Sequence, residues 1–86
     1  MSRQLIANYT FADYATFRAA FDRDSEDRGR NGMTLLQLWR ENPTSAWALY
    51  QISDAKAAQD YLSGAAGVFN AQAGVSAVRS HLVETA

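Results

Sequence analysis

The feature that most constrains this chain is the order of its segments. Across 86 residues the hydrophobic pattern alternates between a period of two and a period of about 3.6, in the order strand, helix, strand, strand, helix, strand. This order predicts an α+β domain in which a four-stranded antiparallel sheet carries two helices on one face and leaves the other face open. Because so short a chain builds one core, we expect a single domain over residues 1–86.

The strands follow from alternation and from turn residues. The first is expected over Arg3 to Phe11, and the others over residues 33–40, 46–52 and 76–84. Asn42 and Pro43 lie in the connector of the central hairpin, where both are favoured turn formers.

The helices follow from caps and apolar stripes. Asp13 is expected to cap the first helix, which carries the aromatic stripe Tyr14, Phe17 and Phe21 and ends near Gly29 or Gly32. Ser53 or Asp54 is expected to cap the second helix, and Gly64 and Gly67 are expected to break it, leaving a ragged piece up to Gly74.

A mixed-sign run over residues 22–30 ends the first helix. Within it, Asp24 to Arg28 and Glu26 to Arg30 have the i, i+4 spacing and the acid-first order that favour ion pairs on a helix surface. The run is therefore expected to form a solvated helix face.

Composition excludes several function classes. Eight Lys and Arg against nine Asp and Glu give a net charge of −1, which argues against nucleic-acid binding. The sequence has no Cys and one His, so a thiolate or transition-metal site is not expected. No apolar run approaches the roughly 18 residues of a membrane span. We expect a cytoplasmic protein that needs no metal or other cofactor and contacts no membrane.

Sorting the strand residues by parity divides them into two sets. One is almost wholly apolar and is expected to face the helices: Leu5, Ala7, Tyr9, Phe11, Leu36, Leu38, Ala48, Tyr50, Ile52, Val78 and Leu82. The other mixes two indoles and aliphatic groups with polar ones: Ile6, Asn8, Thr10, Leu35, Gln37, Trp39, Trp47, Leu49, Gln51, Arg79, His81 and Val83. This second composition is typical of a protein interface. A homodimer is the simplest expectation, with Trp39, Trp47, Leu49, Arg79 and His81 in the interface.

Four stretches of the chain resemble a known superfamily. They are residues 12–14 leading into the aromatic helix, residues 32–34 at the start of the second strand, residues 51–54 at the end of the third strand, and the ending from Gly74 to Glu84. They resemble the dimeric α/β-barrel proteins of the ferredoxin-like superfamily, which includes antibiotic-biosynthesis monooxygenases, small polyketide cyclases, haem-degrading monooxygenases and many members without assigned function. The resemblance implies a βαββαβ fold, a homodimer with its sheets packed face to face, and a small-molecule pocket between sheet and helices.

His81 is the candidate general base, since an unperturbed imidazole titrates near neutral pH. Cyclases of this superfamily use a His on the last strand, which His81 resembles, and a second His on the first strand, where this sequence has Asn8 and Tyr9. By parity His81 lies on the interface face beside Arg79, so the structural interpretation, a hydrogen-bonded interface residue, is preferred.

Four residues are candidates for binding a ligand. Tyr9 and Tyr50 bring hydroxyl groups into the apolar layer below the helices, where a pocket would lie. Trp39, with Trp47 beside it, and Asn8, for which Asn42 is an alternative, resemble the Trp and Asn that attend the substrate in cofactor-free monooxygenases of the superfamily. The sequence therefore favours a protein that binds or transforms a small hydrophobic, aromatic or polyketide-like compound.

Two other function classes share these features. A non-enzymatic dimeric module that binds a ligand or assembles with partners fits the same sequence. An RNA-recognition module shares the segment order and an aromatic sheet face, but Ser45 and Ala46 stand where its motif has a basic residue and Gly. No nucleic-acid partner is therefore expected.

Overall fold

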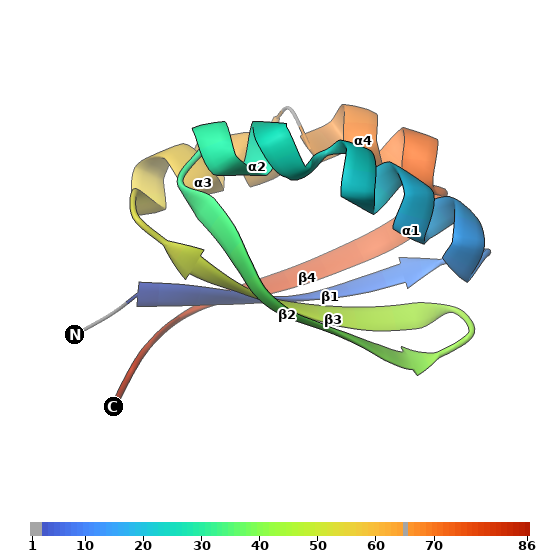
Figure 1. Ribbon diagram of the computed structural model, residues 1–86, viewed down its shortest axis with the longest axis horizontal. Coiled ribbons are helices and arrows are strands. Elements are labelled where there is room, and N and C mark those ends of the chain that lie inside the picture. The colour runs from blue at the N-terminus through green and yellow to red at the C-terminus, as the bar shows by residue number, and fades with distance from the viewer. Residues whose placement is uncertain (1–2, 65) are drawn as a thin grey trace.

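The computed structural model describes residues 3–64 and 66–86, and it confirms the expected α+β architecture. The elements follow one another as β1 (Arg3–Phe11), α1 (Tyr14–Arg23), α2 (Ser25–Arg30), β2 (Met33–Asn42), β3 (Ser45–Ile52), α3 (Ala55–Ser63), α4 (Ala66–Ala73) and β4 (Val75–Glu84). The strands form one antiparallel sheet in the order β2-β3-β1-β4. All of the helices lie on one face of this sheet (Figure 1). No helix in the described ranges is both long and apolar enough to span a membrane.

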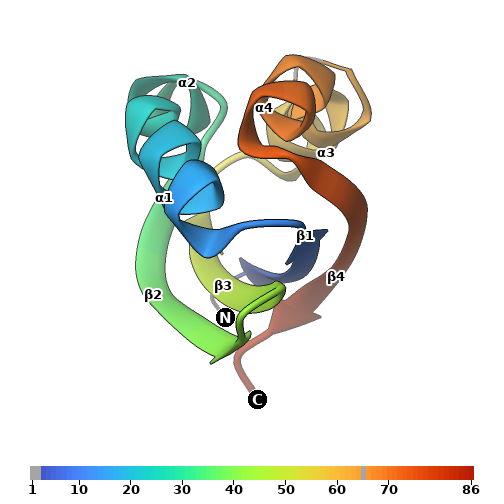
Figure 2. The same cartoon turned by 90° about the vertical axis from the view of Figure 1, so that its right-hand side faces the viewer.

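The sheet is strongly curved. Figure 2 shows the two edge strands, β2 and β4, bending up toward the helices, so that the helix side of the sheet is concave. Strands twist and coil for steric reasons, and a curved sheet surrounds a helix layer better than a flat one. The curvature encloses the core and the cavity described below.

Aspartate caps begin both crossover segments. Asp13 Oδ2 accepts a hydrogen bond from the backbone N–H of Thr16 at 2.9 Å, and Asp54 Oδ1 accepts one from Ala57 at 3.1 Å. Each satisfies an N–H group that has no partner within its own helix. The backbone hydrogen bond from Thr16 also lowers the pKa of Asp13. The cap expected at Asp13 is confirmed, and Asp54 is the cap of the second segment.

Each crossover segment is broken into two helices. The break between α3 and α4 falls at Gly64, as expected, whereas Gly67 lies inside α4. A single glycine costs a helix only about 1 kcal/mol, so α4 continues through it. The first crossover is broken at Asp24, which the sequence pattern did not predict, and it ends at Arg30 before a turn in which Gly32 has a φ of 76°.

Aromatic rings from β1 and α1 form the centre of the core. Phe11 and Phe17 stack with ring centroids 4.4 Å apart, and Tyr9 and Phe21 each lie 5.4 Å from Phe17. Phe17 and Phe21 are buried and Tyr14 is half-buried, which confirms the aromatic stripe predicted for this helix. Offset ring contacts of this kind add to the free energy gained from burial.

The parity prediction fails at one place in β2. Leu35 pairs with Tyr50, but Gln37 pairs with Leu49, so Leu36 is an extra residue in a bulge. Leu35 therefore shares the helix side with Tyr50, although parity placed it on the open face. Leu36, which parity placed against the helices, is 48% exposed. Beyond the bulge the predicted alternation resumes, with Leu38 opposite Ala48 and Trp39 opposite Trp47.

Candidate active site

A cavity of about 100 Å³ lies between the helices and the concave face of the sheet. Its wall is drawn from both crossover segments and from the strands β1 and β4, and is polar on the side of the helices. The lining residues are Tyr9, Asp24, Arg28, Tyr61, Leu62, Asn70, Val78 and Ser80. Polar groups converging in an otherwise apolar interior are the usual composition of a small-molecule site.

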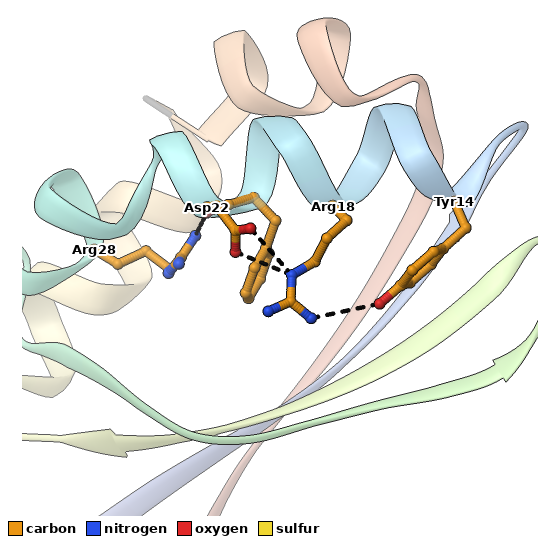
Figure 3. Close-up of polar contacts among 5 residues, drawn as sticks. Tyr14, Arg18, Asp22 and Arg28 are labelled. Carbon is orange, nitrogen blue, oxygen red and sulfur yellow. Dashed lines mark hydrogen bonds and ion pairs between the residues drawn. The ribbon is translucent and has the colours of Figure 1, made fainter.

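Arg28 and Asp24 bring a buried ion pair to the cavity wall. Arg28 is 5% exposed, and its Nη1 lies 3.7 Å from Asp24 Oδ2. The same nitrogen donates a hydrogen bond to the backbone oxygen of Phe21 at 2.8 Å, and the guanidinium lies over the Phe21 ring, 3.9 Å from its centroid. In Figure 3 the Arg28 side chain reaches back along the helix pair toward this backbone oxygen.

This ion pair corrects the expectation that residues 22–30 form a solvated face. The expected pairs of Asp24 with Arg28 and of Glu26 with Arg30 are present, but the first is buried and only the second is exposed. Helical spacing accounts for the burial: Asp24 and Arg28 follow the buried Phe21 at i+3 and i+7, so they continue the helix face that packs toward the sheet. Asp22 behaves as predicted: it accepts hydrogen bonds from Arg18 Nε at 3.0 and 3.2 Å on the exposed side of α1 (Figure 3).

Three tyrosine hydroxyls lie in this polar wall or directly behind it. The Tyr61 hydroxyl donates to Asp24 Oδ2, and the Tyr9 hydroxyl lies 2.8 Å from the Tyr50 hydroxyl. Burial raises the pKa of Tyr9, although the hydrogen bond with Tyr50 acts in the opposite direction. Burial also raises the pKa of Tyr50 and that of Tyr61, the latter helped by the Asp24 carboxylate. All three are therefore neutral phenols near pH 7, able to donate or accept hydrogen bonds.

An open groove continues from the cavity between α3 and β4. The groove has a volume of about 480 Å³ and is lined by Leu5, Gln59, Leu62, Ser80 and Leu82. Leu62 and Ser80 also line the cavity, so the two spaces adjoin at these residues. The groove offers a path from solvent and additional apolar surface next to the polar site.

The predicted ligand residues are divided between the two faces of the sheet. Tyr9 lines the cavity, and Tyr50 lies directly behind it in the core. Asn8 lies on the open face, where its Nδ2 donates to Ser45 Oγ at 3.0 Å and to the Ala46 carbonyl at 3.1 Å. Trp39 is also on the open face. The structure does not bring these last two residues to the cavity, and their assignment as ligand residues stays a prediction.

The residues predicted for the interface form two rows across the open face. Trp39 pairs with Trp47, Trp47 with Asn8, and Asn8 with Arg79. In the adjacent row Leu49 pairs with Ile6 and Ile6 with His81. His81 therefore lies beside Arg79 on the face expected from parity and does not line the cavity.

Five polar residues of the wall were not predicted as site residues from the sequence: Asp24, Arg28, Tyr61, Asn70 and Ser80. Asp24 and Arg28 were expected only as a surface ion pair. The described part of the chain contains no cluster of three or more His, Cys, Asp or Glu residues suited to a metal ion. The wall residues instead supply hydrogen bonds, one cation and one carboxylate.

The fold and cavity define a ferredoxin-like α+β domain with a polar site below its helices. Solved structures of antibiotic-biosynthesis monooxygenases share this fold. SnoaB, a cofactor-independent oxygenase from Streptomyces nogalater, is 21% identical, with a TM-score of 0.70 over 99% of this chain and 93% of its own. The ActVA-Orf6 monooxygenase from Streptomyces coelicolor, solved with the ligand nanaomycin D, is 10% identical. Its TM-score is 0.67 over 99% of this chain and 88% of its own.

The same fold also occurs without an assigned activity. A nipsnap family protein of unknown function from Agrobacterium tumefaciens is 9% identical, with a TM-score of 0.68 over 99% of this chain and 88% of its own. No protein-family model and no curated protein matches the sequence. The similarity therefore establishes the fold, and the chemistry has to be argued from the cavity.

Proposed function

We propose that this protein binds a small hydroxylated aromatic compound in the cavity and oxygenates it with O₂ as a cofactor-independent monooxygenase. The observation that carries the proposal is the buried Asp24–Arg28 ion pair, which lies in the cavity wall together with the hydroxyls of Tyr9 and Tyr61. Buried ion pairs give little net stability compared with an apolar packing, so their placement at a cavity suggests a role in binding or catalysis. The shared fold of SnoaB and ActVA-Orf6 supports the same reaction class.

The cavity suits a single aromatic ring. Its volume of about 100 Å³ is somewhat smaller than the engineered apolar cavity of roughly 150 Å³ that binds benzene. Substituents of the ring would extend past Leu62 and Ser80 into the adjoining groove. The apolar part of the wall, Leu62 and Val78, would contact the ring.

The polar wall supplies what a phenol needs to react with O₂. Asp24 is the proton acceptor for the substrate hydroxyl, and the Arg28 guanidinium stabilises the phenolate that forms. An electron-rich phenolate can transfer an electron to O₂ directly. A phenol with a free para position then becomes a para-quinone, with one oxygen atom of O₂ in the quinone and the other in water. The neutral Tyr9 and Tyr61 hydroxyls orient the substrate oxygen.

A cyclase-type reaction has less support from the site. That chemistry would use His81 as the base, and His81 lies on the open face of the sheet, away from the cavity. Ligand binding without turnover remains the alternative from the non-enzymatic class, and the experiment below separates it from catalysis.

We also propose that a second copy of the chain covers the open face. Trp39 is 46% exposed and lies opposite Trp47, and the next row adds Leu49 and Ile6. Exposed apolar area of this kind is usually an interaction site, and a twofold interface requires one self-complementary patch. Val83, an exposed apolar residue of β4 that pairs with Gln4, adjoins this surface.

An oxygen electrode tests the catalytic proposal. With 1,2- and 1,3-dihydroxybenzene and with naphthalenediols that keep a free para position as substrates, the wild type is expected to consume O₂. Asp24→Asn should bind them while losing about 10²- to 10⁴-fold of the rate, as expected for a missing proton acceptor. Asp22→Asn, a matched change on the exposed side of α1, should keep the wild-type rate. Binding without O₂ consumption by the wild type would instead support the non-enzymatic module.

A further inference from the structure

One polar atom in the cavity wall has no hydrogen-bond partner among the described residues. Asn70 lines the cavity from α4, and its Oδ1 is buried without a hydrogen bond to any described residue. Buried side-chain oxygens are nearly always hydrogen-bonded in native proteins, because an unpaired one loses its interaction with water and gains nothing in return. The partner of this oxygen therefore has to come from whatever occupies the cavity.

Arg28 presents the complementary groups from the other crossover segment. A guanidinium carries five N–H donors, and the described hydrogen bond and ion pair of Arg28 both involve Nη1. Its other nitrogens are available to a molecule in the cavity, which Arg28 also lines. The wall thus combines a cationic donor from α2 with an unpaired acceptor from α4.

We propose that Arg28 and Asn70 form a donor–acceptor pair that selects aromatic rings bearing two oxygen substituents. Arg28 receives the oxygen that ionises, and Asn70 Oδ1 accepts a hydrogen bond from a second hydroxyl. This inference rests on the proposed function and adds the substrate class, a dihydroxylated ring. Asn70 is the specificity-determining residue, since it distinguishes a ring with a second hydroxyl from one without it.

The energetic reason is the unpaired oxygen itself. A ligand without the second hydroxyl displaces water from Asn70 and leaves Oδ1 buried with no donor, whereas a dihydroxylated ligand supplies one. Sites built to hydrogen-bond a substrate hydroxyl discriminate strongly against analogues that lack it. The same argument predicts that an apolar residue at position 70 stabilises the free protein, as often occurs when a functional residue is replaced.

Calorimetric titration of two ligands tests the proposal. In 4-fluorophenol a fluorine of similar size replaces one hydroxyl of 1,4-dihydroxybenzene and cannot donate. We expect the wild type to bind the diol at least about 10-fold more tightly. In Asn70→Leu the preference should fall below about 3-fold, and the variant should unfold about 4 °C higher in the absence of ligand. Gln72→Leu, an exposed change on the same helix, should keep the wild-type preference.

The titrations distinguish a failure of the role of Asn70 from a failure of the proposed function. A preference for the diol that persists in Asn70→Leu overturns the role of Asn70 while leaving the proposed function intact. If Asn70→Leu does not fold, Asn70→Asp and Asn70→Ala take its place. Asn70→Asp keeps the acceptor oxygen and should retain the preference for the diol, whereas Asn70→Ala should lose it. If none of the 1,2-, 1,3- and 1,4-dihydroxybenzenes binds the wild type, the proposed function and this inference both fail.

Discussion

The hydroxyl of Tyr9 lies 2.8 Å from the hydroxyl of Tyr50, and this pair joins the cavity wall to the centre of the core. Tyr9 contacts the cavity from β1, and Tyr50 is fully buried on the adjacent strand β3. A change at either residue therefore affects both the stability of the fold and the shape of the site.

The two hydroxyls are expected to be energetically coupled. Tyr9→Phe and Tyr50→Phe should each lower the free energy of unfolding by about 1 to 3 kcal/mol, because each leaves a buried hydroxyl without this partner. The double variant should cost less than the sum of the two, with a coupling energy of about 0.5 to 2 kcal/mol in urea unfolding. Strictly additive effects would show that the pair contributes no interaction of its own.

Alkaline pH should destabilise the protein through the same pair. The pKa values of Tyr9 and Tyr50 are raised by burial above the ordinary value of 10.0, so above about pH 10 the unfolded chain loses these protons while the folded chain retains them. Stability is therefore fully present below pH 10 and falls above it, by about 1.4 kcal/mol per pH unit for each tyrosine. Urea unfolding between pH 8 and 11 measures the slope. The Tyr9→Phe, Tyr50→Phe double variant should have a smaller slope, and an unchanged one would exclude this cause.

Replacing both indoles of the open face should prevent dimer formation. Light scattering at micromolar concentration is expected to give a dimer for the wild type. Trp39→Lys with Trp47→Lys places charges opposite each other on β2 and β3, where a face-to-face packing would bury them. The double variant should be monomeric or unfolded. A monomeric wild type under the same conditions would rule out the proposed assembly.

His81→Ala separates the two roles considered for the single histidine. Since His81 lies beside Arg79 on the open face, its loss should weaken the dimer by about 1 to 3 kcal/mol and leave ligand binding unchanged. Analytical ultracentrifugation and ligand titration measure the two effects. A dimer of undiminished stability that has lost turnover would make His81 a general base and contradict the interface role.

The fold could be predicted because alternation holds along most of each strand, although the register shifts within β2 and near the start of β4. In β1 the alternating residues from Leu5 to Phe11 all face the helices, as parity requires. In β2 the bulge at Leu36 reverses which residues face the helices. The residues around it, 35–38, include no glycine, proline or charge that would have indicated a bulge.

Part of the site was not predicted because charged residues at i, i+4 spacing on a helix are usually exposed to solvent. Asp24 and Arg28 have the spacing of a surface ion pair, but they also follow the buried Phe21 at i+3 and i+7, which places them on the helix face that packs toward the sheet. Asn70 lies on α4, whose sequence has no clear apolar stripe from which to infer a buried face. Tyr9 and Tyr50 could be found, because strand parity alone places them below the helices.

Nuclear magnetic resonance provides the most direct test of where a ligand binds. The side-chain amide of Asn70 reports on the cavity, and the indole N–H groups of Trp39 and Trp47 report on the open face; comparison with Asn70→Leu assigns the amide signals. On titration with 1,4-dihydroxybenzene, the Asn70 amide signals should move in a saturable way while both indole signals stay in place. Saturable movement of the indole signals with the Asn70 amide unchanged would place the ligand on the open face and contradict the account.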